Sequence, residues 1–228
     1  MAECRRRDWL ALDLPGHGAS DTAPDYDLPA VAALIHQALE GAGLSEPVMV
    51  GHSLAAVLVT FYATIFPVSG VVNVDQSLRT EGFTQMVAPM AARLRSPDFA
   101  TMWPMFRGSM HTELLSHEAQ DLLDASSTPT QELVTGYWKD VLDRPADELT
   151  AYTDQMCAAL RQKAVPYLSV MGAEPEAGYA DWLADAIPQA RMEILPGSGH
   201  FPHLKHPERF ARILADTAHA ASRAGSPS

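Results

Sequence analysis

The chain has 228 residues, of which 47% are hydrophobic and 19% are charged, a balance typical of one large globular domain. The formal net charge of −12 and the lack of an extended Lys/Arg run exclude the usual surface of a nucleic-acid-binding protein. No stretch of about 20 apolar residues could span a bilayer, and no signal peptide is visible, so we expect no membrane partner.

The first part of the chain alternates apolar runs with helical periodicity. Three apolar runs predict strands, at residues 9–12, 47–50 and 70–75. Helices are predicted between them, from Pro29 to Leu39 and from Leu54 to Phe66. Strands that are apolar throughout and alternate with helices predict an α/β fold with a mostly parallel sheet covered on both faces.

The alternation stops after residue 76. Residues 77–163 contain no convincing strand and are rich in methionine and aromatic side chains. These side chains suit a helical core, or a helical cap that lines an apolar pocket over the site. Four helices are predicted here, at 84–94, 117–125, 131–142 and 148–160, with prolines 97, 104, 129 and 145 as breaks.

The α/β alternation resumes after residue 163. Strands are predicted at 165–172 and 191–195, with a helix around Trp182 between them and a final helix at 207–221. Residues 224–228 are predicted to be a disordered tail. The sequence therefore divides into a core of residues 1–76 and 164–223 and a helical insertion of residues 77–163.

Ser53 lies in the most informative segment of the chain. An apolar strand precedes it, an apolar helix follows it, and the small residues Gly51 and Ala55 stand two positions before and after it. A tight turn of this kind lifts a hydroxyl to the top of a sheet and points a helix N-terminus at whatever the hydroxyl attacks. The G-x-S-x-A pattern alone is weak, because a bare strand–helix junction can also show it.

Several motifs in one order resemble the α/β-hydrolase fold superfamily. The loop D-L-P-G-H-G-A-S at residues 13–20 comes first, then the turn at Ser53, then Asp75 at a strand end, and finally P-G-S-G-H ending at His200. The resemblance covers nearly the whole chain outside residues 77–163, and it implies that those residues form a cap. It further implies that Ser53 is the nucleophile and His200 is the base that removes its proton.

The chain departs from the superfamily pattern in its N-terminal part. The superfamily normally has about three further strands and an H-G-x-x-G-like loop before the Asp13 strand, and only twelve residues precede Asp13 here. One of those strands would lie between the strands predicted at 9–12 and 47–50. Without that strand, the two predicted strands must either face a gap or pair with each other directly. We therefore expect an N-terminally truncated version of the fold.

The acid that would hold His200 has two candidates. The position that the superfamily generally uses corresponds to Pro175, which cannot serve, although Glu174 or Glu176 on either side of it could do so from a shifted loop. The superfamily's other position is the end of the strand after the nucleophile helix, which is Asp75. We favour Asp75, because active sites of open parallel sheets lie at the carboxyl ends of the strands.

The resemblance also implies an oxyanion hole that includes the backbone N–H of Leu54. Its second donor would come from a loop that this sequence does not show, so activity could be impaired. Histidines 203 and 206 follow His200 at three-residue steps, but Pro202 and Pro207 interrupt any shared helical face, so the spacing does not favour a metal site.

These features favour a serine hydrolase that cleaves a carboxylic ester or lactone of a small apolar substrate through an acyl-enzyme, without cofactor or metal. A carbon–carbon bond hydrolase with the same triad and an impaired, hydrolase-like ligand-binding protein are the alternatives. Cys4 and Cys157 fit neither a disulfide framework nor a metal site, which favours a cytoplasmic protein. The oligomeric state stays open, with a homodimer as one alternative.

Overall fold

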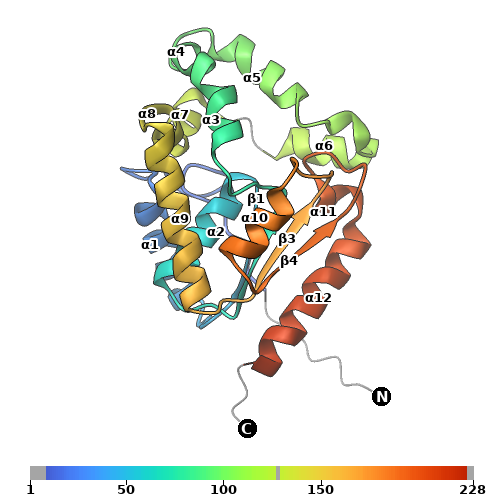
Figure 1. Ribbon diagram of the computed structural model, residues 1–228. Helices are drawn as coiled ribbons and strands as arrows, with labels where there is room; N and C mark the ends of the chain where they lie inside the picture. The colour runs from blue at the N-terminus through green and yellow to red at the C-terminus, as the bar shows by residue number, and fades with distance from the viewer. Residues whose placement is uncertain (1–8, 127–128, 225–228) are drawn as a thin grey trace.

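A computed structural model describes residues 9–126 and 129–224 of the chain, so Cys4 and residues 225–228 of the predicted tail lie outside the described residues. Four parallel strands form a single sheet in the order β1-β2-β3-β4 (Figure 1). Their bounds are Val48–His52 (β1), Gly70–Val74 (β2), Tyr167–Met171 (β3) and Ala190–Ile194 (β4). The predicted α/β fold with a parallel sheet is confirmed.

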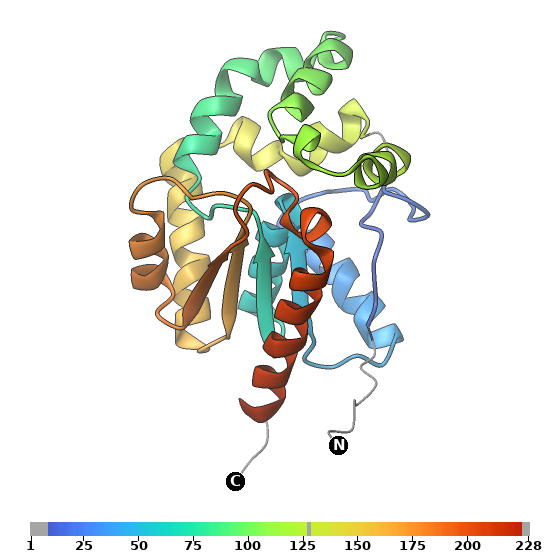
Figure 2. The same ribbon diagram turned by 90° about the vertical axis from the view of Figure 1, so that its right-hand side faces the viewer.

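Helices cover both faces of this sheet (Figures 1 and 2). On one face lie α1 (Leu28–Gly41), α2 (Leu54–Ile65), α9 (Ala146–Gln162) and α10 (Tyr179–Ala186), and α12 (Pro207–Ala224) crosses the other. Each face has its own core cluster, and β2 supplies Val71 to the first and Val72 and Val74 to the second. This division follows the period of two in a strand, whose successive side chains point to opposite faces.

A group of short helices lies beyond the carboxyl ends of the strands, at the top of Figures 1 and 2. A third apolar cluster, built around Val87, Leu94, Val134 and Trp138, holds it together. We refer to residues 81–143 as the helical region; α9 follows it and returns along the sheet. The helical region comprises α3 (Glu81–Val87), η1 (Ala88–Met90), α4 (Ala91–Leu94), α5 (Phe99–Gly108), η2 (Thr112–Leu114), α6 (His117–Ala125), α7 (Gln131–Tyr137) and α8 (Lys139–Asp143).

The helix α5 was not predicted from the sequence, since Pro104 was expected to break the chain there. Pro104 instead lies inside α5. A proline within a helix removes one backbone hydrogen bond and costs about 3 kcal/mol. Phe99, Trp103 and Phe106 of this helix pack into the third apolar cluster, and this burial offsets the loss.

The predicted strand at residues 9–12 is wrong. These residues adopt no regular structure, and the side chains of Trp9, Leu10 and Leu12 are 84%, 43% and 38% exposed. A strand needs a neighbour that accepts and donates its backbone hydrogen bonds, and among the described residues β1 pairs with β2 alone. The side chain of Val50 on β1 is 45% exposed, which marks β1 as an edge of the sheet. No described helix is both long and apolar enough to cross a membrane.

Candidate active site

Ser53 occupies the sharp turn between β1 and α2. Its backbone angles, φ 54° and ψ −129°, are unusual for a residue other than glycine, and its N–H donates to the Val74 carbonyl over 2.9 Å. A Cβ added to Gly51 would lie 2.2 Å from the carbonyl oxygen of Ala55. Gly51 is therefore required, because backbone atoms of the following helix approach it closely.

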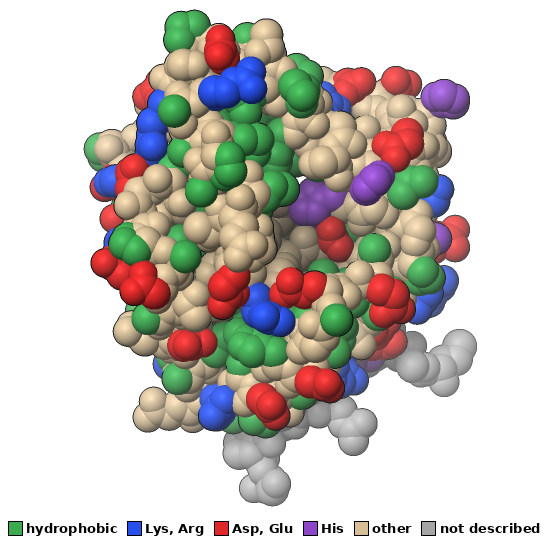
Figure 3. Space-filling model, turned by 45° about the horizontal axis from the view of Figure 1, so that its top comes forward, with side chains coloured by type: hydrophobic (Ala, Val, Ile, Leu, Met, Phe, Trp, Pro, Cys, Tyr) green, Lys and Arg blue, Asp and Glu red, His purple; other side chains and the backbone are tan. Residues whose placement is uncertain are grey.

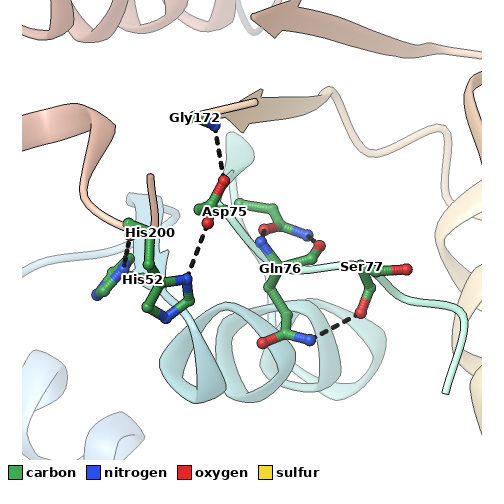
Figure 4. A network of polar contacts seen from close by, with 7 residues as sticks. His52, Asp75, Gln76, Ser77, Gly172 and His200 are labelled. Atoms are coloured by element: carbon green, nitrogen blue, oxygen red, sulfur yellow. Dashed lines mark hydrogen bonds and ion pairs between the residues drawn. The ribbon is translucent and has the colours of Figure 1, made fainter. Parts of the chain in front are cut away.

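Asp75 lies directly after β2, beside the residue that anchors Ser53. Its N–H donates to the Val170 carbonyl of β3 over 2.8 Å, and its φ is 54°. One carboxylate oxygen accepts the N–H of Gly172 at 2.6 Å, and the other lies 2.8 Å from Nδ1 of His200 (Figure 4). The side chains of Asp75 and His200 are only 15% and 20% exposed. The structure therefore brings together the carboxylate and the imidazole that the sequence analysis favoured.

The carboxylate also determines which nitrogen of His200 carries the hydrogen. A carboxylate accepts hydrogen bonds, so Nδ1 of His200 is the donor. In the neutral ring Nε2 then keeps its lone pair and can accept a proton. The ionised carboxylate would also stabilise the imidazolium formed by that proton.

The loop that carries His200 closes tightly on the sheet. Ser198 donates its N–H to the Gly172 carbonyl over 3.1 Å, and a Cβ added to Gly172 would lie 1.9 Å from the carbonyl oxygen of Gly199. Gly197 and Gly199 have φ values of 73° and 55°, which glycine adopts readily. The two glycines thus allow the loop to bend back over the end of β3.

A second imidazole, His52, supports the first. It directly precedes Ser53, and its Nε2–H donates to the His200 carbonyl at 2.6 Å, since a carbonyl can only accept. The ring centroids of His52 and His200 are 4.6 Å apart. The pKa of His52 is well below its usual value, mainly because the ring is buried and secondly because His200 lies nearby. The sequence analysis missed this role, and the only signal was the position of His52 inside the Ser53 turn.

His203, on the short helix α11 (Pro202–Lys205), also packs against His52, with ring centroids 4.6 Å apart. Its Nδ1 is buried without a partner, and burial lowers the pKa of His203 to about 4. Within the described residues, no group of three or more His, Cys, Asp or Glu side chains could hold a metal ion. His203 is therefore an uncharged packing residue near neutral pH.

The other residues considered from the sequence lie around this centre. Glu174 is exposed and forms no hydrogen bond or ion pair with the described residues, whereas its neighbour Glu176 lies 3.4 Å from Arg79. Leu54 is the first residue of α2, so its N–H is among those that a helix N-terminus leaves without an intrahelical acceptor. Its side chain packs against the third apolar cluster.

A buried polar network shapes the turn after Asp75. The side-chain amide of Asn73 donates to the Gln76 carbonyl at 2.8 Å and to Oη of Tyr167 at 3.0 Å, and it accepts the N–H of Gln76. The hydroxyl of Tyr167 lies 3.0 Å from that of Thr60 on α2. This network ties the Asp75 turn to β3 and α2, and the sequence analysis did not identify it.

One face of the molecule is hollowed beside histidine side chains (Figure 3). Figure 3 shows histidine side chains at the edge of a hollow, next to a band of hydrophobic side chains. A cavity of about 260 Å³ lies elsewhere, between α5 and α6, and its lining includes Arg107, Gln120 and Asp124. The described residues that line that cavity include no serine, cysteine or histidine, whereas Asp75 and His200 are paired at the strand ends where the Ser53 turn also lies, so these three residues mark the better candidate site.

Comparisons with known proteins agree with this fold. The sequence model of the Alpha/beta hydrolase family matches residues 2–213. The 2-succinyl-6-hydroxy-2,4-cyclohexadiene-1-carboxylate synthase of Serratia proteamaculans (strain 568) is 28% identical over 221 residues, 93% of this chain and 84% of that protein. The pimeloyl-[acyl-carrier protein] methyl ester esterase of Chromobacterium violaceum is 28% identical over 214 residues, 90% of this chain and 81% of that protein.

A solved structure shows the same fold. The structure of Est816, an N-acyl homoserine lactone degrading enzyme, superposes with a TM-score of 0.64 at 20% identity. The match covers 89% of this chain and 80% of that one.

Proposed function

This chain belongs to the Alpha/beta hydrolase family, and we propose that it is a serine hydrolase that cleaves a carboxylic ester or lactone of a small, largely apolar substrate. The observation that carries the proposal is the hydrogen bond between His200 and Asp75 at the strand ends next to Ser53. The relatives named as a methyl ester esterase and a lactone degrading enzyme support ester and lactone bonds as the substrate class.

In the proposed reaction, Nε2 of His200 takes the proton of the Ser53 hydroxyl as the oxygen attacks the substrate carbonyl carbon. The negative charge that develops on the carbonyl oxygen is stabilised by the N–H of Leu54 and the N-terminus of α2. Asp75 stabilises the imidazolium and keeps it oriented.

His200 then returns its proton to the leaving alkoxide, and the acyl group stays on Ser53 as an ester. In the second half, His200 removes a proton from water, the hydroxide attacks the acyl-enzyme, and Ser53 leaves with that proton. The products are a carboxylic acid and an alcohol, or the single hydroxy acid from a lactone. Only the side chains named and water take part, so the proposed chemistry uses no metal or cofactor.

The apolar character of the substrate is inferred from the aromatic side chains in the cluster that includes Leu54. Its side chain is in the same cluster as Phe83, Trp103 and Trp138 of the helical region. Aromatic side chains bind acyl chains and rings by dispersion and by removing apolar surface from water. We expect p-nitrophenyl hexanoate to have a higher kcat/KM than p-nitrophenyl acetate.

The test is covalent labelling by a fluorophosphonate probe, which reacts with an activated serine and needs no knowledge of the substrate. Wild type should be labelled, Ser53→Ala should not, and Ser69→Ala, at a half-buried serine outside the site, should label like wild type. Peptide mapping should place the adduct on Ser53. A wild-type protein that stays unlabelled while folded would overturn the proposal in favour of a ligand-binding protein.

A further inference from the structure

Both backbone groups of His200 are held by residues far away in the sequence. The carbonyl accepts Nε2–H of His52 at 2.6 Å, on the side of the sheet. The N–H donates to the carbonyl of Met110 at 3.1 Å, and Met110 belongs to the helical region. The backbone of His200 is thus fixed both by the end of the strand before Ser53 and by the helical region.

Three further contacts join the segment 110–115 to the loop and helix around His200. A Cβ added to Gly199 would lie 2.8 Å from Cβ of His111. The Lys205 ammonium donates to the Leu114 carbonyl. Leu115, 5% exposed, packs in one cluster with Phe201. The segment therefore touches the residues before, at and after His200.

The backbone of this segment is itself unusual. His111 has φ 57° and ψ 44°, a left-handed conformation that non-glycine residues seldom adopt. Its side chain is exposed and lies 3.0 Å from the Glu113 carboxylate, so it is not held there by burial. Such conformations persist where the surrounding contacts fix the chain, and here those contacts are with the His200 loop.

We propose that residues 110–115 are a positioning segment that holds His200 in its working place, so that the helical region and the base move together. This inference rests on the proposed role of His200 as the base. No residue of the segment needs to touch the reacting atoms, because it acts through the backbone of His200. A substrate that displaces the helical region would displace the imidazole with it.

Gly199→Ala tests the contact, and Gly197→Ala is its matched control. Both glycines lie in the same loop with positive φ, but an added Cβ meets the segment only at Gly199 and has nothing within 4 Å at Gly197. We expect Gly199→Ala to lower kcat about 100-fold relative to Gly197→Ala with KM little changed, the loss typical of a group misplaced by about 1 Å. Adding His111→Gly to Gly199→Ala should restore part of the loss, because it removes the opposing Cβ.

A second pair of variants, Leu115→Ala and Leu149→Ala, tests the contact without changing a residue of the His200 loop. Leu115 and Leu149 are both 5% exposed, but only Leu115 packs with Phe201. Leu115→Ala should lower kcat about tenfold, while Leu149→Ala should leave it within about twofold of wild type. These two variants decide the question if Gly199→Ala does not fold.

The NMR signal of the His200 Nδ1 proton gives a readout that does not need turnover. It is identified by its absence in His200→Gln, and it should shift more in Gly199→Ala than in Gly197→Ala and more in Leu115→Ala than in Leu149→Ala. If wild type is inactive but the Nδ1 proton signal shifts in this pattern, the proposed function is wrong and the positioning role stands. An active wild type in which each variant matches its control in kcat and in the proton signal would overturn the positioning role.

Discussion

Nδ1 of His200 lies 2.8 Å from Oδ2 of Asp75, although 125 positions separate the two residues in the sequence. The parallel sheet creates this pairing, because Asp75 follows β2, His200 follows β4, and β3 lies between them. The other oxygen of Asp75 is held by the N–H of Gly172 at the end of β3. The Asp75 carboxylate is thus held in place by a backbone N–H as well as by His200.

Asp75→Asn should reduce kcat for p-nitrophenyl butyrate by about 10³–10⁴. Asparagine can offer its N–H₂ to His200 and so favours the wrong tautomer, and it carries no charge to stabilise the imidazolium. Glu174→Gln is the matched control, since Glu174 is exposed and unpaired among the described residues. A greater loss in Glu174→Gln than in Asp75→Asn would contradict the assignment of the acid.

His52→Phe should reduce both stability and turnover. Phenylalanine keeps a ring against His200 and His203 but cannot donate to the His200 carbonyl. An acceptor left unsatisfied in a partly buried site costs about 1–3 kcal/mol, which denaturant unfolding can resolve. An unfolding midpoint and kcat both equal to those of wild type would show that the hydrogen bond has no role.

Stability should fall as the pH is lowered from 7 to 4, in part because of His203. Burial lowers the pKa of His203 from a usual value of 6.5 to about 4, so the folded protein keeps this ring neutral where the unfolded chain protonates it. The stabilisation is complete above pH 6.5 and is lost as the pH falls toward 4. Each such histidine contributes a slope of up to about 1.4 kcal/mol per pH unit.

The control for this pH dependence is His203→Phe. It removes the titrating ring and the unpartnered Nδ1, and it leaves an aromatic side chain beside Phe201 and Phe210. Urea unfolding at pH 7 and pH 5 should show a smaller difference in this variant than in wild type. An unchanged difference would mean that His203 does not titrate in this range.

Gly51→Ala should disrupt the turn at Ser53. The new Cβ would lie 2.2 Å from a backbone oxygen, so the chain itself must shift, and we expect a loss of about 3 kcal/mol in unfolding free energy. Fluorophosphonate labelling should slow in parallel. Gly41→Ala at the end of α1 meets nothing within 4 Å and should be neutral or slightly stabilising.

Much of the fold could be predicted from local patterns. Apolar runs and helical periodicity identified the four strands and the helices that cover them, because burial imposes those periods on the sequence itself. The helix α5 and residues 9–12 were mispredicted. In the first case tertiary packing offset a proline, and in the second an apolar segment had no strand beside it.

The candidate site likewise contains residues that the sequence indicated and contacts that only the tertiary structure revealed. The order of the sequence motifs, which resembles that of the α/β-hydrolase superfamily, singled out Ser53 and His200, and a tight turn and a bendable loop place glycine and small residues near both of them. The sequence analysis favoured Asp75 over Glu174, which both follow apolar strands, but it did not find His52 and Met110 beside His200. Only the tertiary structure decided which carboxylate meets the imidazole, because strand register and loop closure join residues that no local pattern connects.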